Sequence, residues 1–336
     1  MSELPPATLR APSLAMAKPV ARVPGPAVLP GGCVYEPKWD GFRCGVVAEE
    51  AGVTIWSRQG KDLTRYFPDL AAAAQEHIPA GCVVDGEALT WTGDRLDFNA
   101  LQTRLTTARR ALPALVKEHP ASFAAFDILA VAGHDTRGLI LSDRRALLEE
   151  LAAGWAPPLN LSPATSDYAT ALEWFEEMPA TGIEGLVVKG AAQKYEGGVR
   201  QWLKVKHRDN IDVVCAAVIG RRDAPYALVV GLPMFGRLWI VGSTTALGRS
   251  ASQHLAMHLH SPRPDHPWPE EISPTVIDRF TSRKDPIRLT RVEPLVVEVS
   301  ADVAWSGRSF RHPLRYLRAR PELDPAAVTA PEHLGG

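Results

Sequence analysis

Cysteine is scarce in this sequence, with four residues among 336 and none in a C-x-x-C pair. Such isolated thiols fit a reducing compartment and exclude a disulfide framework or a zinc site. Long apolar runs are missing too: no stretch approaches the ~20 residues of a membrane-spanning helix. The N-terminal residues contain no signal-peptide apolar region. The sequence therefore predicts a cytoplasmic protein with no membrane partner.

An excess of charge of one sign is also missing, because 37 Lys+Arg stand against 38 Asp+Glu, for a net charge of −1. The charges are unevenly distributed along the chain. Residues 197–320 hold 19 Lys+Arg and 11 Asp+Glu, a net of +8, whereas the remainder has a net of −9. A positive field over one part of a protein attracts a polyanion such as a nucleic-acid backbone. The alternative is an uneven surface without a partner.

Length and pattern predict two domains with terminal extensions. The 336 residues are 46% hydrophobic, enough for two buried cores. Proline-rich residues 1–25 predict a flexible arm. Residues 26–208 alternate short apolar strands with helical segments, expected near 66–76, 144–152 and 171–178. Residues 209–320 contain short strands separated by turns, which predict a small closed barrel. A hinge is expected near 206–210 and a loose tail over 321–336.

One segment near the N-terminus carries the strongest chemical signal. Lys38 begins a K-x-D-G-x-R sequence that ends at Arg43. A lysine in a pocket beside an acid can act as a nucleophile. The glycine lets the backbone pass close to a ligand, and the arginine offers a planar fork for phosphate or ribose oxygens. For this segment alone, a solvated lysine beside a turn is the alternative.

Further segments follow in a fixed order, each placing charged residues at or near a predicted strand. They are Ser57–Lys61, Val83–Ala88, Ala125–Leu129, Glu184–Lys189 and Trp202–Lys206. Alternation along the last of them puts Lys204 and Lys206 on one face. In their order and spacing, these motifs closely resemble the nucleotidyltransferase motifs of ATP-dependent DNA ligases. The resemblance covers about residues 25–320.

The resemblance implies both a fold and an activity. The fold is α+β, with an adenylation (nucleotidyltransferase) domain of antiparallel sheets followed by a small OB-fold barrel. The activity is ATP-dependent sealing of nicks in duplex DNA, in repair, by a short bacterial enzyme similar to ligase C. The implied cofactors are ATP and Mg²⁺, with Mn²⁺ as a substitute. The implied partners are nicked duplex DNA and a gap-filling polymerase or other repair protein, met by a monomer in the nucleoid.

The resemblance also implies roles for single residues. Lys38 is the nucleophile that takes AMP, and the cations Lys204 and Lys206 favour its neutral amine and hold the α-phosphate. Glu87 contacts the ribose or a metal, and Glu184 carries metal. The acids Asp85 and Asp127 assist them.

Recognition of the base falls to Phe126 and Glu36. Phe126 would stack on the adenine, although the core is the usual place for a phenylalanine in such a strand. Glu36 would help to read the adenine edge. Three arginines match further contacts, with the nucleotide or with the 5′-phosphate at the nick: Arg43, Arg58 and Arg200.

The last motif is cationic and lies at residues 310–320. Its side chains could bind a pyrophosphate or a DNA backbone; they are those of Arg311, Arg315, Arg318 and Arg320. The family usually ends this motif with R-x-D-K, whereas here Glu322 replaces the acid and Leu323 replaces the lysine. Arg318 or Arg320 is therefore expected to orient the pyrophosphate.

Three other functions remain open. A capping-type guanylyltransferase shares K-x-D-G, and an RNA ligase shares most of the motifs. A repair scaffold without catalysis is the third, but the intact lysines and glutamates argue against it. Labelling with ATP against GTP, and joining of nicked DNA against nicked RNA, would separate the first two from a DNA ligase.

Overall fold

The computed structural model describes residues 11–278, 281, 284–302, 305–306 and 308–331. The first ten residues of the expected arm and the last five of the expected tail lie outside the described residues. The chain divides into two compact units, Met1–His207 and Arg208–Gly336. Only His207 separates the last strand of the first unit, β11 (Arg200–Lys206), from the first strand of the second, β12 (Arg208–Arg221). No loop therefore lies at the expected hinge.

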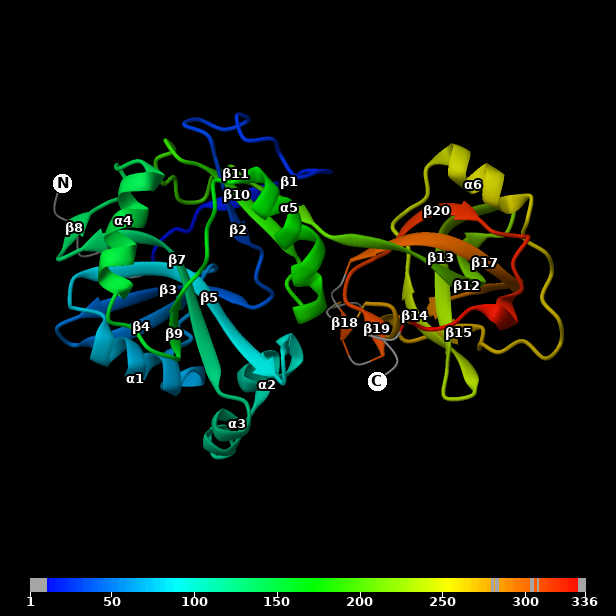
Figure 1. The fold of residues 1–336 in the computed structure, drawn as a ribbon. Helices are drawn as coiled ribbons and strands as arrows, with labels where there is room; N and C mark the ends of the chain where they lie inside the picture. The colour runs from blue at the N-terminus through cyan, green and yellow to red at the C-terminus, as the bar shows by residue number, and fades with distance from the viewer. Residues whose placement is uncertain (1–10, 279–280, 282–283, 303–304, 307, 332–336) are drawn as a thin grey trace. The chain divides into compact units, whose positions relative to one another are not determined.

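The first unit contains two sheets (Figure 1). The larger has the order β4 (Gly52–Ser57), β3 (Phe42–Glu49), β5 (Cys82–Thr92), β7 (Ala121–Val131) and β8 (His134–Asp135). Two short strands join it, β6 (Arg95–Leu96) on β5 and β9 (Leu159–Leu161) on β7. The smaller sheet has the order β1 (Met16–Pro19), β11, β10 (Gly185–Gly190) and β2 (Cys33–Pro37). Pairing is antiparallel except for β1 with β11 and β7 with β9.

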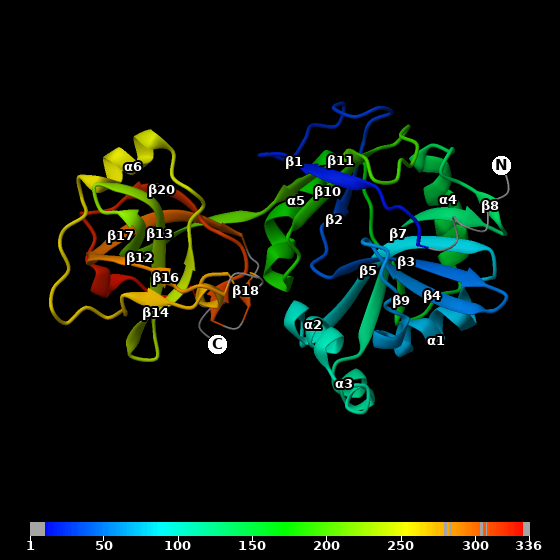
Figure 2. The ribbon, with the colours of Figure 1, turned by 180° about the vertical axis from the view of Figure 1, so that it is seen from behind.

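The two sheets of the first unit face each other, and helices cover their outer faces (Figure 2). Strand alternation sends Val46 of β3 to one core and Val47 to another. The first core lies beneath α1 (Pro68–His77), α2 (Phe98–Thr106) and α4 (Leu141–Ala152). The second core lies between the sheets, and α5 (Tyr168–Glu177) covers the far side of the smaller sheet.

Three helices of the first unit match the sequence prediction. Segments expected near 66–76, 144–152 and 171–178 form α1, α4 and α5. The helices α2 and α3 (Leu112–Glu118) were not predicted. A signal for α2 was present, because Asp97 caps it by accepting a 2.9 Å hydrogen bond from the backbone N–H of Ala100.

The expected flexible arm is wrong for the part of residues 11–25 that forms β1. Leu14 and Ala15 are buried, with 3% and 0% of their surface exposed, and Met16–Pro19 pair with β11. The prolines that suggested an arm do not prevent this pairing. β1 is an edge strand and Pro19 ends it, a place where a missing N–H costs little.

The second unit is an OB-fold barrel built from an antiparallel sheet. Its strand order is β14 (Arg237–Ser243), β13 (Ala224–Met234), β12, β17 (Thr290–Asp302) and β20 (Arg315–Ala319). A bridge between Thr244 and Leu314 joins the two ends of this order and closes the barrel. Leu255 of α6 (Arg249–Ala256) packs into the barrel core. Two short ladders accompany it, β15 (Glu271–Ile272) with β16 (Ile287–Arg288) and β18 (Trp305–Ser306) with β19 (Ser309–Phe310).

The two units confirm the predicted α+β fold class. The loose tail expected over 321–336 is wrong for its described part, because Val328 is 8% exposed and packs into the barrel core. Within the described ranges, no helix is both long and apolar enough to cross a membrane.

Candidate active site

A cavity of about 380 Å³ lies in the first unit and is lined by residues of both sheets. Its size falls within the usual range for small-molecule sites. The sequence predicted many of its lining residues: Glu36, Lys38, Arg43, Arg58, Glu87, Phe126, Arg200 and Lys204. It did not single out others, among them Met16, Ala17, Lys189 and Trp202. Residues from Met16 to Lys204 thus share one cavity.

Strand register brings Lys38 to Glu184. In the smaller sheet Pro37 lies opposite Leu186, and Gly185 lies opposite Lys206. The backbone N–H of Lys38 donates to Gly185 O at 2.7 Å. The Lys38 ammonium donates to Glu184 Oε2, and Lys206 Nζ lies 3.0 Å from Glu184 Oε1. Glu184, only 3% exposed, therefore holds two lysines at once.

The charge state of Lys38 reflects these carboxylates. Burial acts to lower the pKa of Lys38, but Glu184, with Glu87 and Asp40, outweighs it and raises the pKa above its usual value. An amine attacks only in its neutral form. Positive charge must therefore offset Glu184 before Lys38 can act as a nucleophile.

Lys204 supplies part of that positive charge. Its pKa is lowered, first by burial and then by repulsion from Lys38 and Lys206. Lys204 and Lys206 lie on the same face of β11, as alternation predicted, and Lys204 lines the cavity. Two cations are thus held near the nucleophile candidate, where a phosphate would be attracted.

Glu87 lies on β5 opposite Arg43 of β3. Burial raises the pKa of Glu87 to about 8, against the opposing effect of Lys38 and Arg43. Gly41 makes this strand approach possible, because a Cβ there would lie 2.2 Å from Ala88 O and 2.9 Å from Glu87 Cγ. The glycine of the K-x-D-G motif therefore accommodates the neighbouring strand, where the sequence suggested a turn around a ligand.

Arg43 lines the cavity but its guanidinium is already bound. Its Nε and Nη2 donate to Asp85 Oδ1 and Oδ2 at 3.0 and 2.6 Å, and Nη1 donates to Ala15 O at 2.5 Å. The sequence predicted a fork for phosphate or ribose oxygens. In the structure the fork faces Asp85, which is 0% exposed and also accepts from the Tyr195 hydroxyl at 2.6 Å. Arg43 thus belongs to a fixed wall of the cavity.

Asp127 has a comparable structural role. It is 1% exposed, where the sequence suggested an accessible acid that assists with metal. Arg144 Nε and Nη2 donate to its two oxygens at 2.7 and 3.0 Å. A bidentate arginine satisfies a buried carboxylate well. Asp85 and Asp127 are therefore paired inside the core and do not line the cavity.

Phe126 is both a core residue and a cavity residue, so its position is compatible with core packing and with stacking on adenine. The side chain is 8% exposed and packs in the core between the sheets, yet it also lines the cavity. Trp202 stands at right angles to it, with ring centroids 6.3 Å apart. The two aromatic rings form an apolar wall suited to a base.

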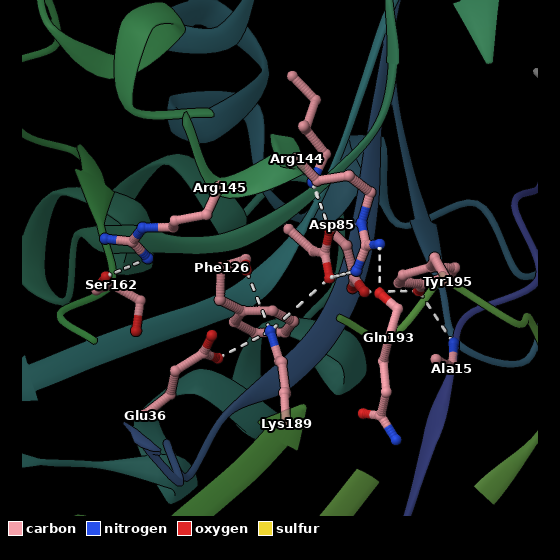
Figure 3. Close-up of polar contacts among 12 residues, drawn as sticks. Ala15, Glu36, Asp85, Phe126, Arg144, Arg145, Ser162, Lys189, Gln193 and Tyr195 are labelled. Atoms are coloured by element: carbon pink, nitrogen blue, oxygen red, sulfur yellow. Dashed lines mark hydrogen bonds and ion pairs between the residues drawn. The ribbon is translucent and has the colours of Figure 1, made fainter. Parts of the chain in front are cut away.

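Lys189 also lines the cavity, although the sequence motifs assigned it no role. It is 0% exposed, and its Nζ lies 2.8 Å from Glu36 Oε2 and 3.0 Å from Phe126 O (Figure 3). A signal was available, because Lys189 follows Val187 by two positions on β10 and so shares its face. A lysine at the end of a buried apolar strand needs an internal partner.

The remaining candidates differ in how exposed they are. Arg58 and Arg200 are exposed at the cavity edge. In the second unit, Arg311 is 9% exposed and Arg315 is exposed on β20. Arg318 and Arg320 donate to Glu298 and Glu322, each at 2.5 Å. Glu322, the residue that departs from the family pattern, is thus an ion-pair partner of Arg320.

Comparisons with known proteins show the family of this chain. The family described as "ATP dependent DNA ligase domain" matches residues 17–206. DNA ligase C2 of Mycolicibacterium smegmatis is 36% identical over 322 residues, covering 90% of this chain and 90% of the relative. DNA ligase C of Mycobacterium tuberculosis is 35% identical over 326 residues, covering 90% of this chain and 89% of the relative.

A solved structure described as Pmar-Lig_Pre shares the fold. Its TM-score is 0.55 at 17% identity, and the match covers 91% of this chain and 67% of that one. The family match includes every residue that lines the cavity except Met16. The chain belongs to the ATP-dependent DNA ligases.

Proposed function

We propose that this ligase seals nicks in duplex DNA through a covalent AMP on Lys38. The observation that carries the proposal is the convergence of Lys38, Glu184, Lys204 and Lys206 beside a cavity with an aromatic wall. The Lys38 amine attacks the α-phosphorus of ATP, and pyrophosphate leaves. AMP then passes to the 5′-phosphate at the nick. Attack by the 3′-hydroxyl joins the strands and releases AMP.

The residues around the cavity divide this work. Phe126 and Trp202 hold the adenine, and Glu36 accepts a hydrogen bond from its amino group. Glu87 contacts the ribose. Lys204 and Lys206 bind the α-phosphate and stabilise the charge that develops on it. The exposed arginines at the cavity edge, Arg58 and Arg200, contact phosphates of ATP or of the nick.

Glu87 and Glu184 are the carboxylates suited to a metal. Among the residues that the structure describes, no group of three or more His, Cys, Asp or Glu is placed to hold one. One or two carboxylates fit Mg²⁺ nonetheless, because this ion takes its other ligands from phosphates and water. When bound there, Mg²⁺ or Mn²⁺ would neutralise the phosphates and offset the effect of Glu184 on Lys38.

A two-stage labelling experiment tests the proposal. The protein is incubated with α-labelled ATP and Mg²⁺, and a nicked duplex is then added. We expect a labelled protein first, and then a sealed strand with loss of the protein label. Labelling of the protein by GTP would support a guanylyltransferase. Preferential joining of nicked RNA would support an RNA ligase, and absence of labelling would support a scaffold.

Removal of the second unit tests the role of its arginines. A chain of residues 1–207 keeps both sheets and their cores but loses Arg311, Arg315, Arg318 and Arg320. We expect it to bind ATP and to adenylate itself poorly, measured as label per protein. Adenylation at the full-length rate would mean that these arginines serve only DNA.

Binding to DNA should weaken steeply as salt rises. Residues 197–320 carry a net charge of +8, and neutralised phosphates release counterions. Contacts with phosphates also carry little base preference. Gel shifts on nicked duplexes of unrelated sequence at increasing salt measure both effects. A flat salt response, or strong preference for one sequence, would contradict binding through the backbone.

We place the protein in DNA repair, as a monomer acting in the nucleoid of the cytoplasm. The name of one relative supports a role in repair: the "Multifunctional non-homologous end joining protein LigD" of Mycobacterium bovis. It is 28% identical over 303 residues, and the match covers 37% of that protein. A gap-filling polymerase is a fitting partner, because it leaves nicks. Stimulation of sealing on gapped DNA by such a polymerase, and sedimentation of the free protein, test these points.

A further inference from the structure

Glu36 presents one fixed and one available oxygen. The residue is 2% exposed and lines the cavity. Its Oε2 lies 2.8 Å from Lys189 Nζ. Its Oε1 is buried and has no hydrogen-bond partner within the described part of the chain. A buried acceptor without a partner is costly, so the site is built for a donor that arrives with a ligand.

The geometry around Lys189 explains why only one oxygen is available. Its ammonium also donates to Phe126 O at 3.0 Å and lies 4.7 Å and 4.4 Å from the ring centroids of Phe126 and Trp202. These contacts fix Nζ beneath the aromatic wall. Because Nζ is fixed, Glu36 Oε2 is fixed, which leaves Oε1 as the oxygen that can accept from a ligand in the cavity.

The neighbouring charges leave Lys189 as the close counter-ion of Glu36. Asp127 is 3.8 Å from Lys189 Nζ but is already paired with Arg144 through two hydrogen bonds. Arg43 is likewise paired with Asp85. Burial raises the pKa of Glu36, and Lys189 is the main group that opposes this rise. Arg145 opposes it more weakly, and its own guanidinium binds Glu149 and the carbonyl of Ser162. A buried carboxylate stays ionised only with such a partner.

We propose that Lys189 is a positioning residue that makes Glu36 selective for adenine over guanine. An ionised carboxylate can only accept hydrogen bonds. Adenine presents an amino donor at N6, whereas guanine presents the acceptor O6 at the equivalent position. Lys189 thus favours ATP and rejects GTP without touching either base. The inference rests on the proposed function only in placing adenine in this cavity.

The test replaces Lys189 with methionine, which keeps the length of the side chain and removes the charge. Equilibrium binding of ATP and GTP to the full chain is measured by calorimetry, and formation of labelled protein is followed separately. We expect the preference for ATP over GTP to fall by about tenfold or more, because a polar site that no longer matches its ligand loses its discrimination.

Two further variants make the result specific. Lys194→Met changes an exposed lysine of the neighbouring loop and should leave the ATP preference unchanged. Glu36→Gln should lose the preference like Lys189→Met, and the double variant should be no worse than Glu36→Gln alone. The double variant also removes both buried charges, so it answers the question if Lys189→Met does not fold.

The outcomes separate the inference from the proposed function. An ATP preference in Lys189→Met within twofold of the parent, with Glu36→Gln impaired, would overturn the role of Lys189. In the double variant, a preference lower than that of Glu36→Gln alone would overturn it too, because Lys189 would then act independently of Glu36. Failure of the parent protein to form labelled protein–AMP would overturn the proposed function, whereas the binding ratios would still decide the inference.

Discussion

Replacement of Lys38 with alanine should abolish protein–AMP formation while leaving the fold intact. The side chain is the nucleophile candidate, and its ammonium contacts Glu184, which would keep Lys206 as a partner in the variant. Loss of a nucleophile typically removes several orders of magnitude in rate, on the order of 10⁴-fold or more. Gel detection of protein labelled from ATP measures the effect, and circular dichroism checks the fold.

A control variant and a substrate that already carries AMP make this prediction more specific. Lys117→Ala removes an exposed lysine of α3 and should label like the parent protein. The Lys38→Ala protein should still seal a nick that already carries AMP, because the last step no longer needs the nucleophile. Retained labelling of Lys38→Ala would show that another residue accepts AMP.

Replacement of Glu184 with alanine should reduce sealing on the order of 10²- to 10³-fold, as expected for a residue that positions the cations which stabilise reacting phosphates. It removes the carboxylate that Lys38 and Lys206 share and a candidate metal ligand. The loss should persist at saturating ATP and Mg²⁺, because the defect lies in the chemical steps. Single-turnover sealing rates measure it, with the exposed Glu173→Ala on α5 as the control.

Phe126→Leu provides the comparison that ranks these roles. Stacking on a base contributes about 1–3 kcal/mol, so this variant should bind ATP less tightly. Its sealing rate should recover at saturating ATP, unlike that of Glu184→Ala. A larger loss at saturation for Phe126→Leu than for Glu184→Ala would reverse the assigned roles.

Residues that face the cavity could be predicted when they sit in strand motifs. Lys38, Glu184, Lys204 and Lys206 are recognisable because each belongs to a motif of a few consecutive residues. The pairing of Arg43 with Asp85 could not be predicted, since it depends on two strands separated by 42 positions. The sequence motif therefore predicted that Arg43 binds a ligand, whereas in the structure it pairs with Asp85.

The N-terminal segment and Lys189 were missed for a similar physical reason. Proline-rich composition indicates disorder only when nothing covers the apolar residues, and here β11 and Tyr195 bind residues 15–19. The role of Lys189 depends on Glu36 and Phe126, which lie far from it in the sequence. Both features therefore depend on tertiary contacts, which local sequence patterns do not contain.

The position of β1 sets a limit on how far the start of the chain can be trimmed. Met16, Ala17 and Pro19 line the cavity, and Ala15 anchors them by donating to the Tyr195 hydroxyl at 2.9 Å and accepting from Arg43. A recombinant protein that starts after residue 20 would retain every recognised motif and yet lack one side of the proposed nucleotide pocket. Sequence motifs alone would therefore be a poor guide to cloning boundaries in this ligase.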